Sequence, residues 1–176
     1  MALYVSERSR VSLWLFNDTR MAWLWLVVRL YLGWEWLSAG WEKAVGGGWL
    51  GAQAGTAITG FMQGALAKTG GAHPDVQWWY AWFITHGVLA HPLIWSDVIV
   101  AGEMLVGLGL IAGCLTGAAA FFGFVMNINF MLAGSVSVNP IWLILSLLLM
   151  LAWRTAGWWG IDRFVLPRVY KRLRRG

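Results

Sequence analysis

Four polar side chains lie inside long apolar stretches of this chain, where a group that carries charge or moves a proton is unusual. Arg29 and Glu35 belong to the stretch 21–45, Glu103 to 92–113 and Asn127 to 116–134. Ionisable groups in apolar helices are costly, so they are candidates for function by default. A carboxylate at such a place can hold or transfer a proton, and an amide can orient a ligand.

The depth of these residues predicts that they meet. At a helix rise of about 1.5 Å per residue, Arg29 lies about 12 Å from the helix edge at Met21. By the same measure Glu103 lies about 15 Å from the edge at Gly113, and Asn127 about 16 Å into its own stretch. We therefore expect Arg29 and Glu103 to form a buried ion pair that Asn127 joins. Such a pair either handles protons or ligand, or only holds helices together.

The first apolar stretch carries further charges. Glu35 and Glu42 are seven residues apart and share one helix face, whereas Arg29 and Glu35 differ by about 120° and are not expected to pair. Glu35 needs another partner. Lys43 is predicted near the outer end of the helix, where its long side chain reaches water.

The composition identifies the solvent of these helices. Of 176 residues, 59% are hydrophobic and 12% are charged, with 15 Trp and 22 Gly. A soluble domain is about 25% charged, so too little polar surface remains for a soluble fold. The net charge of +5 gathers at the two chain ends, and no nucleic-acid-binding motif accompanies it. Lipid is therefore the expected partner, and nucleic acid is not.

We predict an all-α integral membrane four-helix bundle that forms a single membrane domain. A spanning helix needs about 20 apolar residues, and four stretches qualify. The long loop 46–91 is expected to hold short interfacial helices at 56–67 and 76–90. The predicted spans are 21–45, 92–113, 116–134 and 140–156.

Charge predicts the orientation of the bundle. Basic residues precede the first span and follow the last, whereas the loop 46–91 offers Lys68 alone. The positive-inside rule then places both termini and the basic tail 160–176 in the cytoplasm, with the loop outside the cell membrane. The tail could also hold anionic lipid. These basic residues are Arg8, Arg10, Arg20, Arg154, Arg163, Arg168, Lys171, Arg172, Arg174 and Arg175.

The loop contains a dense aromatic segment, 78–83, that includes Trp79. It is either an aromatic belt that anchors a surface helix or a platform over a quinone-sized pocket. His86 and His91 are five residues apart and lack a Cys or carboxylate cluster, so no metal or haem is expected. The single cysteine, Cys114, is either a small buried hydrophobe or a reactive thiol.

Several segments together resemble the DoxX/DoxD-like membrane proteins. The stretch RLYLGWEWLSAGWEK (29–43) is similar to the family's first span, and GEMLVGLGLIAG (102–113) to its second. Segments 127–134, 139–140 and 156–162 are similar to the later spans and tail. The resemblance implies a four-helix bundle in the cell membrane, and its DoxD branch implies the large subunit of a thiosulfate:quinone oxidoreductase.

The resemblance also implies roles for the polar residues. Glu103, Arg29 and Glu35 are the candidate catalytic residues, and Lys43 and Asn127 are candidate substrate-binding ones. Trp79 joins the substrate-binding candidates from the aromatic segment and not from the resemblance. A membrane quinone would sit near Glu103 and Arg29, and Lys43 would attract thiosulfate or another small sulfur donor. The alternative is a non-enzymatic accessory subunit that docks a partner protein through glycine-rich helix faces. Whether the chain is an enzyme by itself stays open.

Overall fold

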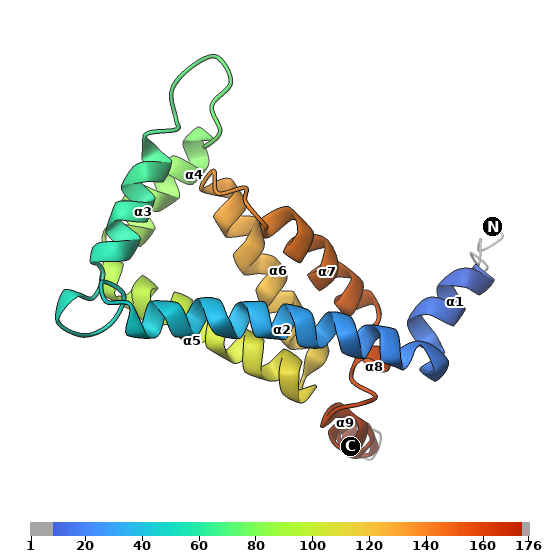
Figure 1. The fold of residues 1–176 in the computed structure, drawn as a ribbon. Coiled ribbons are helices and arrows are strands. Elements are labelled where there is room, and N and C mark those ends of the chain that lie inside the picture. The colour runs from blue at the N-terminus through green and yellow to red at the C-terminus, as the bar shows by residue number, and fades with distance from the viewer. Residues whose placement is uncertain (1–8, 174–176) are drawn as a thin grey trace.

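Helices make up all the regular structure in the computed structural model, which describes residues 9–173 (Figure 1). This confirms the all-α class for that part of the chain. The basic residues Arg8, Arg174 and Arg175 lie outside the described residues. The elements in chain order are α1 (Arg10–Asn17), the 3-10 helix η1 (Thr19–Met21), α2 (Ala22–Val45), the 3-10 helix η2 (Gly51–Gln53), α3 (Thr56–Leu66), α4 (Trp78–Phe83), the π-helix η3 (Ile84–Val88), α5 (Pro92–Ala112), α6 (Thr116–Leu132), α7 (Asn139–Leu151), α8 (Trp153–Ala156) and α9 (Asp162–Leu173).

Proline and glycine set the ends of the long helices. Pro92 opens α5 and Pro140 lies in the first turn of α7, where the missing N–H costs nothing. Gly46 ends α2, and Gly47 and Gly48 then adopt positive φ. Gly113, at φ 62°, ends α5 in the left-handed conformation. These boundaries lie within two residues of those expected for the first three apolar stretches.

The fourth apolar stretch differs from the expectation of one helix through residue 156. The helix α7 ends at Leu151, and a short separate helix, α8, follows. The break turns α8 toward α1, where the Thr155 hydroxyl donates to the Phe16 carbonyl at 2.7 Å. A long-range contact therefore ends α7 before its apolar sequence ends.

Within residues 9–173, one helix, α5, is both long enough at 21 residues and apolar enough to cross a membrane. The apolar helices α6 and α7 are shorter, at 17 and 13 residues. The longest helix, α2, has 24 residues but also holds four charged side chains. These are Arg29, Glu35, Glu42 and Lys43.

The long helices pack in two antiparallel pairs, α2 with α5 and α6 with α7, and α5 joins the pairs through α6 (Figure 1). A core of large apolar side chains fills the space between them. Its most deeply buried members include Leu32, Trp36, Leu110 and Leu149. The rings of Trp36 and Trp142 pack against each other in a tilted arrangement, with their centroids 5.4 Å apart. This core ties all four helices together.

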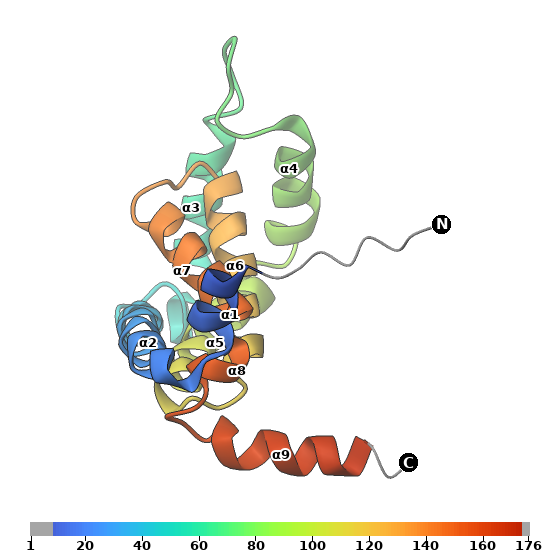
Figure 2. The same cartoon turned by 90° about the vertical axis from the view of Figure 1, so that its right-hand side faces the viewer.

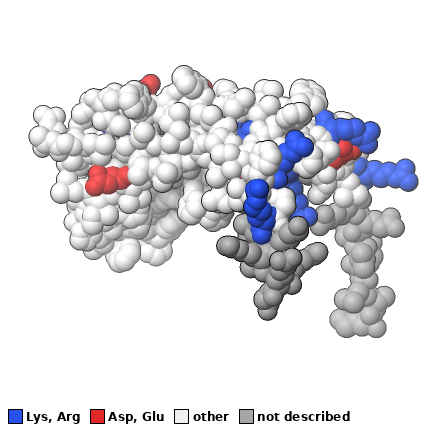
Figure 3. Space-filling model, turned by 90° about the horizontal axis from the view of Figure 1, so that it is seen from below, with Lys and Arg blue, Asp and Glu red and all other residues white. Residues whose placement is uncertain are grey.

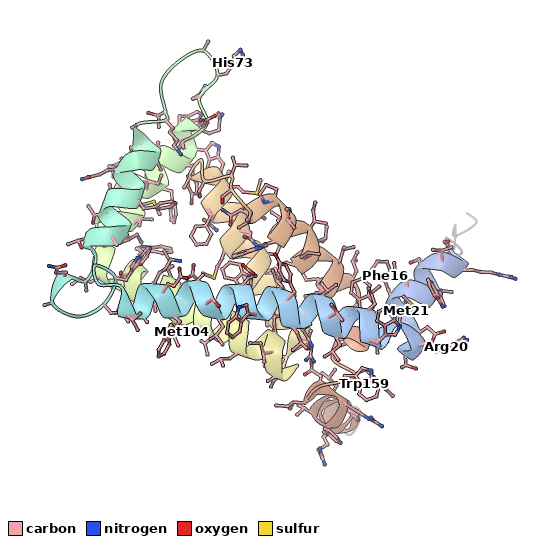
Figure 4. All side chains as sticks on the ribbon, viewed as in Figure 1. Phe16, Arg20, Met21, His73, Met104 and Trp159 are labelled. Carbon is pink, nitrogen blue, oxygen red and sulfur yellow. The ribbon has the colours of Figure 1, made fainter. Side chains whose placement is uncertain are left out.

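The two ends of the bundle carry different structures. At one end, α3, α4 and η3 form a cap with its own core of Ile58, Met62, Ile84 and Val88. The loop between α3 and α4, which carries His73, extends beyond this cap (Figure 4). At the other end lie α1, α8 and α9, which we call the basic end. There α9 runs across the end of α2 and not along it, as the two views show (Figures 1 and 2).

Three glycines let α2 and α5 approach closely. A Cβ on Gly107 would lie 2.5 Å from the backbone nitrogen of Leu37, and one on Gly40 would lie 2.9 Å from that of Met104. Gly33 meets Ile111 in the same way, at 3.0 Å from its nitrogen. The contacts recur about every four residues, so the glycines bring the two backbones together along about three turns.

Replacing Gly107 with alanine is expected to destabilise the bundle by about 1–3 kcal/mol, because the new methyl group meets backbone that cannot move aside. Gly64→Ala in α3 is the matched control, since nothing lies within 4 Å of its Cβ position. That change should be neutral or stabilise by about 0.5–1 kcal/mol. Thermal unfolding in detergent measures both, and equal melting temperatures for the two variants would refute the close approach.

Candidate functional site

Glu103 is a buried carboxylate that pairs with Lys43. Lys43 Nζ lies 2.8 Å from Glu103 Oε2, and the two side chains are 24% and 1% exposed. Lys43 also lies over the Trp49 ring, 5.5 Å from its centroid. The contact of Gly40 with Met104 and Glu103 sets this register between α2 and α5. The pair therefore links a buried carboxylate to the partly exposed surface near the cap.

The expected pairing of Arg29 with Glu103 is wrong. Arg29 lies near the other end of α5, where its Nη2 donates to the Trp159 carbonyl at 3.1 Å. Its Nη1 fits between Gly113 and Gly160, and a Cβ on either glycine would collide with it. Arg29, Glu103 and Asn127 therefore do not meet at a common centre. Arg29 instead joins α2 to the tail.

The depth estimate fails because Met21 and Gly113, from which the depths of Arg29 and Glu103 are counted, do not lie at the same level. The helix α2 continues about two turns beyond the end of α5. Gly113 is therefore level with Arg29. The additional turns of α2 pack against α1, where Trp25 Nε1 donates to the Leu15 carbonyl at 2.8 Å. Helix length alone does not reveal such an overhang.

Asp162 is a structural residue that the sequence analysis did not single out. Its carboxylate oxygens accept from the backbone N–H groups of Leu115 and Thr116, at 2.7 and 2.8 Å. The carboxylate thus caps the first turn of α6 from the tail and holds Leu115 at φ 51°. Asp162 is the first residue of α9 and lies 46 residues after Thr116, so no local signal indicates a cap for α6.

Asn127 lies in the core between the helix pairs. It is fully buried, and neither its amide nitrogen nor its oxygen has a hydrogen-bond partner. The indole nitrogens of Trp36 and Trp142 and the hydroxyl of Ser146 are buried without a partner as well. Trp36 Nε1 lies 3.2 Å from the Cβ position of Gly123, one turn before Asn127 on α6. The core thus contains unpaired polar groups from α2, α6 and α7, a rare arrangement in folded proteins.

A large apolar cavity of about 840 Å³ lies along α5 and α6 and beneath the cap. We call it the groove. Its walls include Leu105 and Gly109 from α5 and Ala118 and Phe122 from α6. The turn residues Cys114 and Leu115 line one end, and Tyr80, Phe83, Val88 and Trp95 line the other. Glu103 faces α2 on a different side of α5, so the groove and the ion pair occupy separate faces of one helix.

The cap end of the groove carries its polar groups. The Tyr80 hydroxyl lies 2.9 Å from the Asn129 carbonyl and 3.2 Å from Asn129 Oδ1. Asn129 Nδ2 donates one hydrogen to the Val125 carbonyl, which leaves its second hydrogen for another acceptor. Burial raises the pKa of Tyr80 to about 12, so its hydroxyl stays protonated near neutral pH. The π-helix η3 next to it contributes Val88, and π-helical turns are frequent at functional sites.

The remaining candidate residues lie outside the groove lining. Trp79 is 46% exposed and contacts Tyr80 edge-on at 5.5 Å. Glu35 is half-buried on α2 and takes part in neither ion pair of the described part of the chain. His86 stacks on Trp82, and its Nδ1 lies 3.0 Å from the Trp82 carbonyl. Tyr80 and Phe83, rather than Trp79, are thus the aromatic residues of segment 78–83 that line the groove.

A family model described as "TQO small subunit DoxD" matches residues 24–174. The chain belongs to the DoxD family. No curated protein and no solved structure matches it. TQO denotes thiosulfate:quinone oxidoreductase, and DoxD membership supports a membrane subunit of a quinone oxidoreductase. Because the family is a subunit of such a complex, its membership supports a partner subunit for this chain.

The DoxD match corrects one detail of the expected family assignment. The resemblance in the sequence implied a large subunit, whereas the family description names the small subunit. The large-subunit assignment is therefore not confirmed. The matched range includes every residue of the ion pair, the groove and the Arg29 contacts, so all three features belong to the part of the chain that makes it DoxD-like.

The Lys43–Glu103 pair predicts an asymmetric response to substitution. Lys43→Met should destabilise by about 3 kcal/mol, because it leaves the buried carboxylate without a partner. Glu103→Gln should cost less, since Lys43 is partly exposed and water can solvate it. The double variant should recover most of the loss, because a neutral pair at this place costs little.

Chemical unfolding in detergent measures this cycle, with Glu42→Gln on the exposed side of α2 as the control. Additive effects of the two single changes would mean that the ion pair contributes no coupling energy.

Proposed function

We propose that this DoxD-family chain passes electrons from thiosulfate or another small sulfur donor to membrane quinone, and that the quinone binds in the groove. The observation that carries the proposal is the groove itself, an apolar cavity of about 840 Å³ with polar groups at one end. Small-molecule sites commonly have about this volume, apolar walls and a few polar groups that fix orientation.

The lining of the groove suits the two parts of a quinone. The Asn129 amide and the Tyr80 hydroxyl offer hydrogen bonds to a quinone carbonyl at the cap end. The apolar walls that continue toward Cys114 suit an isoprenoid tail. Gly102 and Gly109 leave room for a ligand along α5, because neither carries a side chain into the cavity. The head group would therefore lie near the cap and the tail toward the α5–α6 turn.

Quinone reduction takes up protons as well as electrons, and the ion pair is the proposed proton-handling group. Glu103 is buried while its partner Lys43 is partly exposed, so the pair connects the interior with the surface near the cap. Glu103 follows Gly102, which lines the groove. Asn127 would assist this proton handling as a further buried polar group, which lies between the helix pairs. Arg29 has no such role in this proposal, because it lies at the far end of α5.

The proposed donor is a small sulfur anion that approaches from the cap side. Lys43 and Lys68 are the cations near the cap among the described residues, and Lys68 donates to the Gly134 carbonyl at 2.6 Å. Glu103 offsets the charge of Lys43, so the attraction for an anion would strengthen whenever Glu103 takes up a proton. Anion approach and proton uptake would thus support each other.

For the membrane topology, we propose that α2, α5, α6 and the α7–α8 segment span the cell membrane, with the cap outside. Lys and Arg side chains gather over one end of the molecule, where α1 and α9 lie (Figure 3). The positive-inside rule assigns that end to the cytoplasm. Large exposed apolar side chains along α2 then face lipid, and Trp23, Val27, Trp34 and Trp41 are examples.

A second candidate function is that of an accessory subunit that docks a partner chain in the membrane. The family description as a small subunit favours it. The glycines once expected to form its docking face do not support it, because Gly102, Gly107 and Gly109 pack against residues of this same chain. Gentle solubilisation followed by mass spectrometry tests this function, and a partner-free protein with quinone activity would contradict it.

The single cysteine provides a direct test of quinone binding. Cys114 is partly exposed and lines the end of the groove. Bound decylubiquinone should slow the labelling of Cys114 by a lipid-soluble maleimide in the purified protein. Ala118→Phe should weaken this protection about tenfold, the effect of losing ~1.4 kcal/mol of binding, because the new ring fills the groove.

Ile144→Phe on the exposed side of α7 is the control, since it introduces the same aromatic ring away from the groove. Labelling that is insensitive to quinone, or equal protection in the two variants, would place the quinone elsewhere. Thiosulfate-dependent quinone reduction by the purified complex then tests the donor, and its absence with quinone binding intact would reject thiosulfate alone.

A further inference from the structure

A second cavity, of about 400 Å³, lies at the basic end of the molecule, far along the chain from the cap. Its walls come from the segment between α8 and α9, the first turn of α9 and the last residue of α5. They include Trp158, Trp159, Gly160, Arg163 and Phe164. The cavity thus combines aromatic rings with a cation, and of its lining residues Ala112 also lines the groove.

Two arginines make this cavity electropositive. The exposed Arg163 guanidinium lies over the Trp158 ring, 5.0 Å from its centroid. Arg29 lies directly behind Gly160, which lines the cavity, and its Nη1 is 2.7 Å from the Gly160 Cβ position. Arg29 is 1% exposed, and its Nε and Nη1 atoms have no hydrogen-bond partner. A buried guanidinium with unused donors therefore stands behind the wall of the cavity.

The nearest acidic residue does not cancel this charge at the cavity. Asp162 uses one carboxylate oxygen for the Leu115 N–H and the other for the Thr116 N–H. It forms no ion pair with Arg29 or Arg163. Asp162 thus offsets one of the two guanidinium charges, and Arg168 adds another farther along α9. The net charge around the cavity remains positive.

The surroundings of the cavity are apolar and exposed. Trp159 is 58% exposed, Ile161 45% and Phe164 61%. Figure 4 shows Trp159 near the start of α9, and Figures 1 and 2 show α9 lying across the end of the bundle rather than along it. A helix that lies across the end of a bundle, with aromatic and basic side chains together, fits the interface between lipid tails and head groups.

We propose that this cavity binds the phosphate group of an anionic phospholipid, with Arg163 as its main contact and Arg29 adding positive charge from behind. The exposed rings of Trp159 and Phe164 would lie among the lipid chains near the head group. A lipid phosphate is favoured over a neutral head group because Arg163 lines the small cavity and Arg29 adds its charge from directly behind the wall. The proposal does not rest on the quinone function, although Ala112 lines both this cavity and the groove.

The test measures lipid retained by the purified full-length protein. The protein is incubated with vesicles of phosphatidylcholine alone or of phosphatidylcholine with an equal share of phosphatidylglycerol, and native mass spectrometry counts the lipids bound. The wild type should retain phosphatidylglycerol preferentially. Arg163→Gln should lower that preference roughly fivefold, which corresponds to losing about 1 kcal/mol of binding.

Arg10→Gln is the matched control, because it removes the same charge from the exposed surface of α1 at the same end. It should leave the preference unchanged. Equal losses in both variants would show a diffuse electrostatic effect without a site, and equal retention of the two lipids by the wild type would overturn the proposal. Displacement of phosphatidylglycerol by inorganic phosphate at millimolar concentration would also overturn it, by identifying a site for a small free oxyanion.

Discussion

The close approach of α2 and α5 determines the position of every other feature in this protein. Gly33, Gly40 and Gly107 allow the two backbones to touch, and because each fits against a particular residue of the partner helix, together they favour this register. In this register Lys43 reaches Glu103, and the next helices pack against a paired unit instead of a single helix. Without the glycines, larger side chains would separate the helices, and Glu103 would be buried without its cation.

This register also explains why the polar residues form two separate centres rather than one. The overhang of α2 places Arg29 beyond the end of α5, beside the tail, and Glu103 pairs with Lys43 instead. A buried charge needs a local partner, and the antiparallel pairing supplies a different one at each end. One centre therefore couples helices to the cap and the other couples them to the tail.

The sequence predicted the helices better than their contacts. Glycines and prolines marked the ends of α2, α5 and α6 to within two residues, because those signals act locally. The Arg29–Glu103 pair was wrong because relative helix level depends on how far each helix extends past its neighbour. The cap of α6 by Asp162 and the aromatic lining by Tyr80 depend on contacts across 46 and 49 residues. No local pattern encodes such contacts, although the apolar setting of Glu103 did indicate that it is buried.

The capping of α6 by Asp162 has a consequence for the order in which the protein matures. The turn that this carboxylate holds includes Cys114 and Leu115, and the same turn lines the end of the groove opposite the cap. During synthesis the ribosome makes this turn well before residue 162. The groove therefore reaches its final shape only after almost the whole chain has been translated, and a truncated product would present an open, unfinished cavity to the membrane.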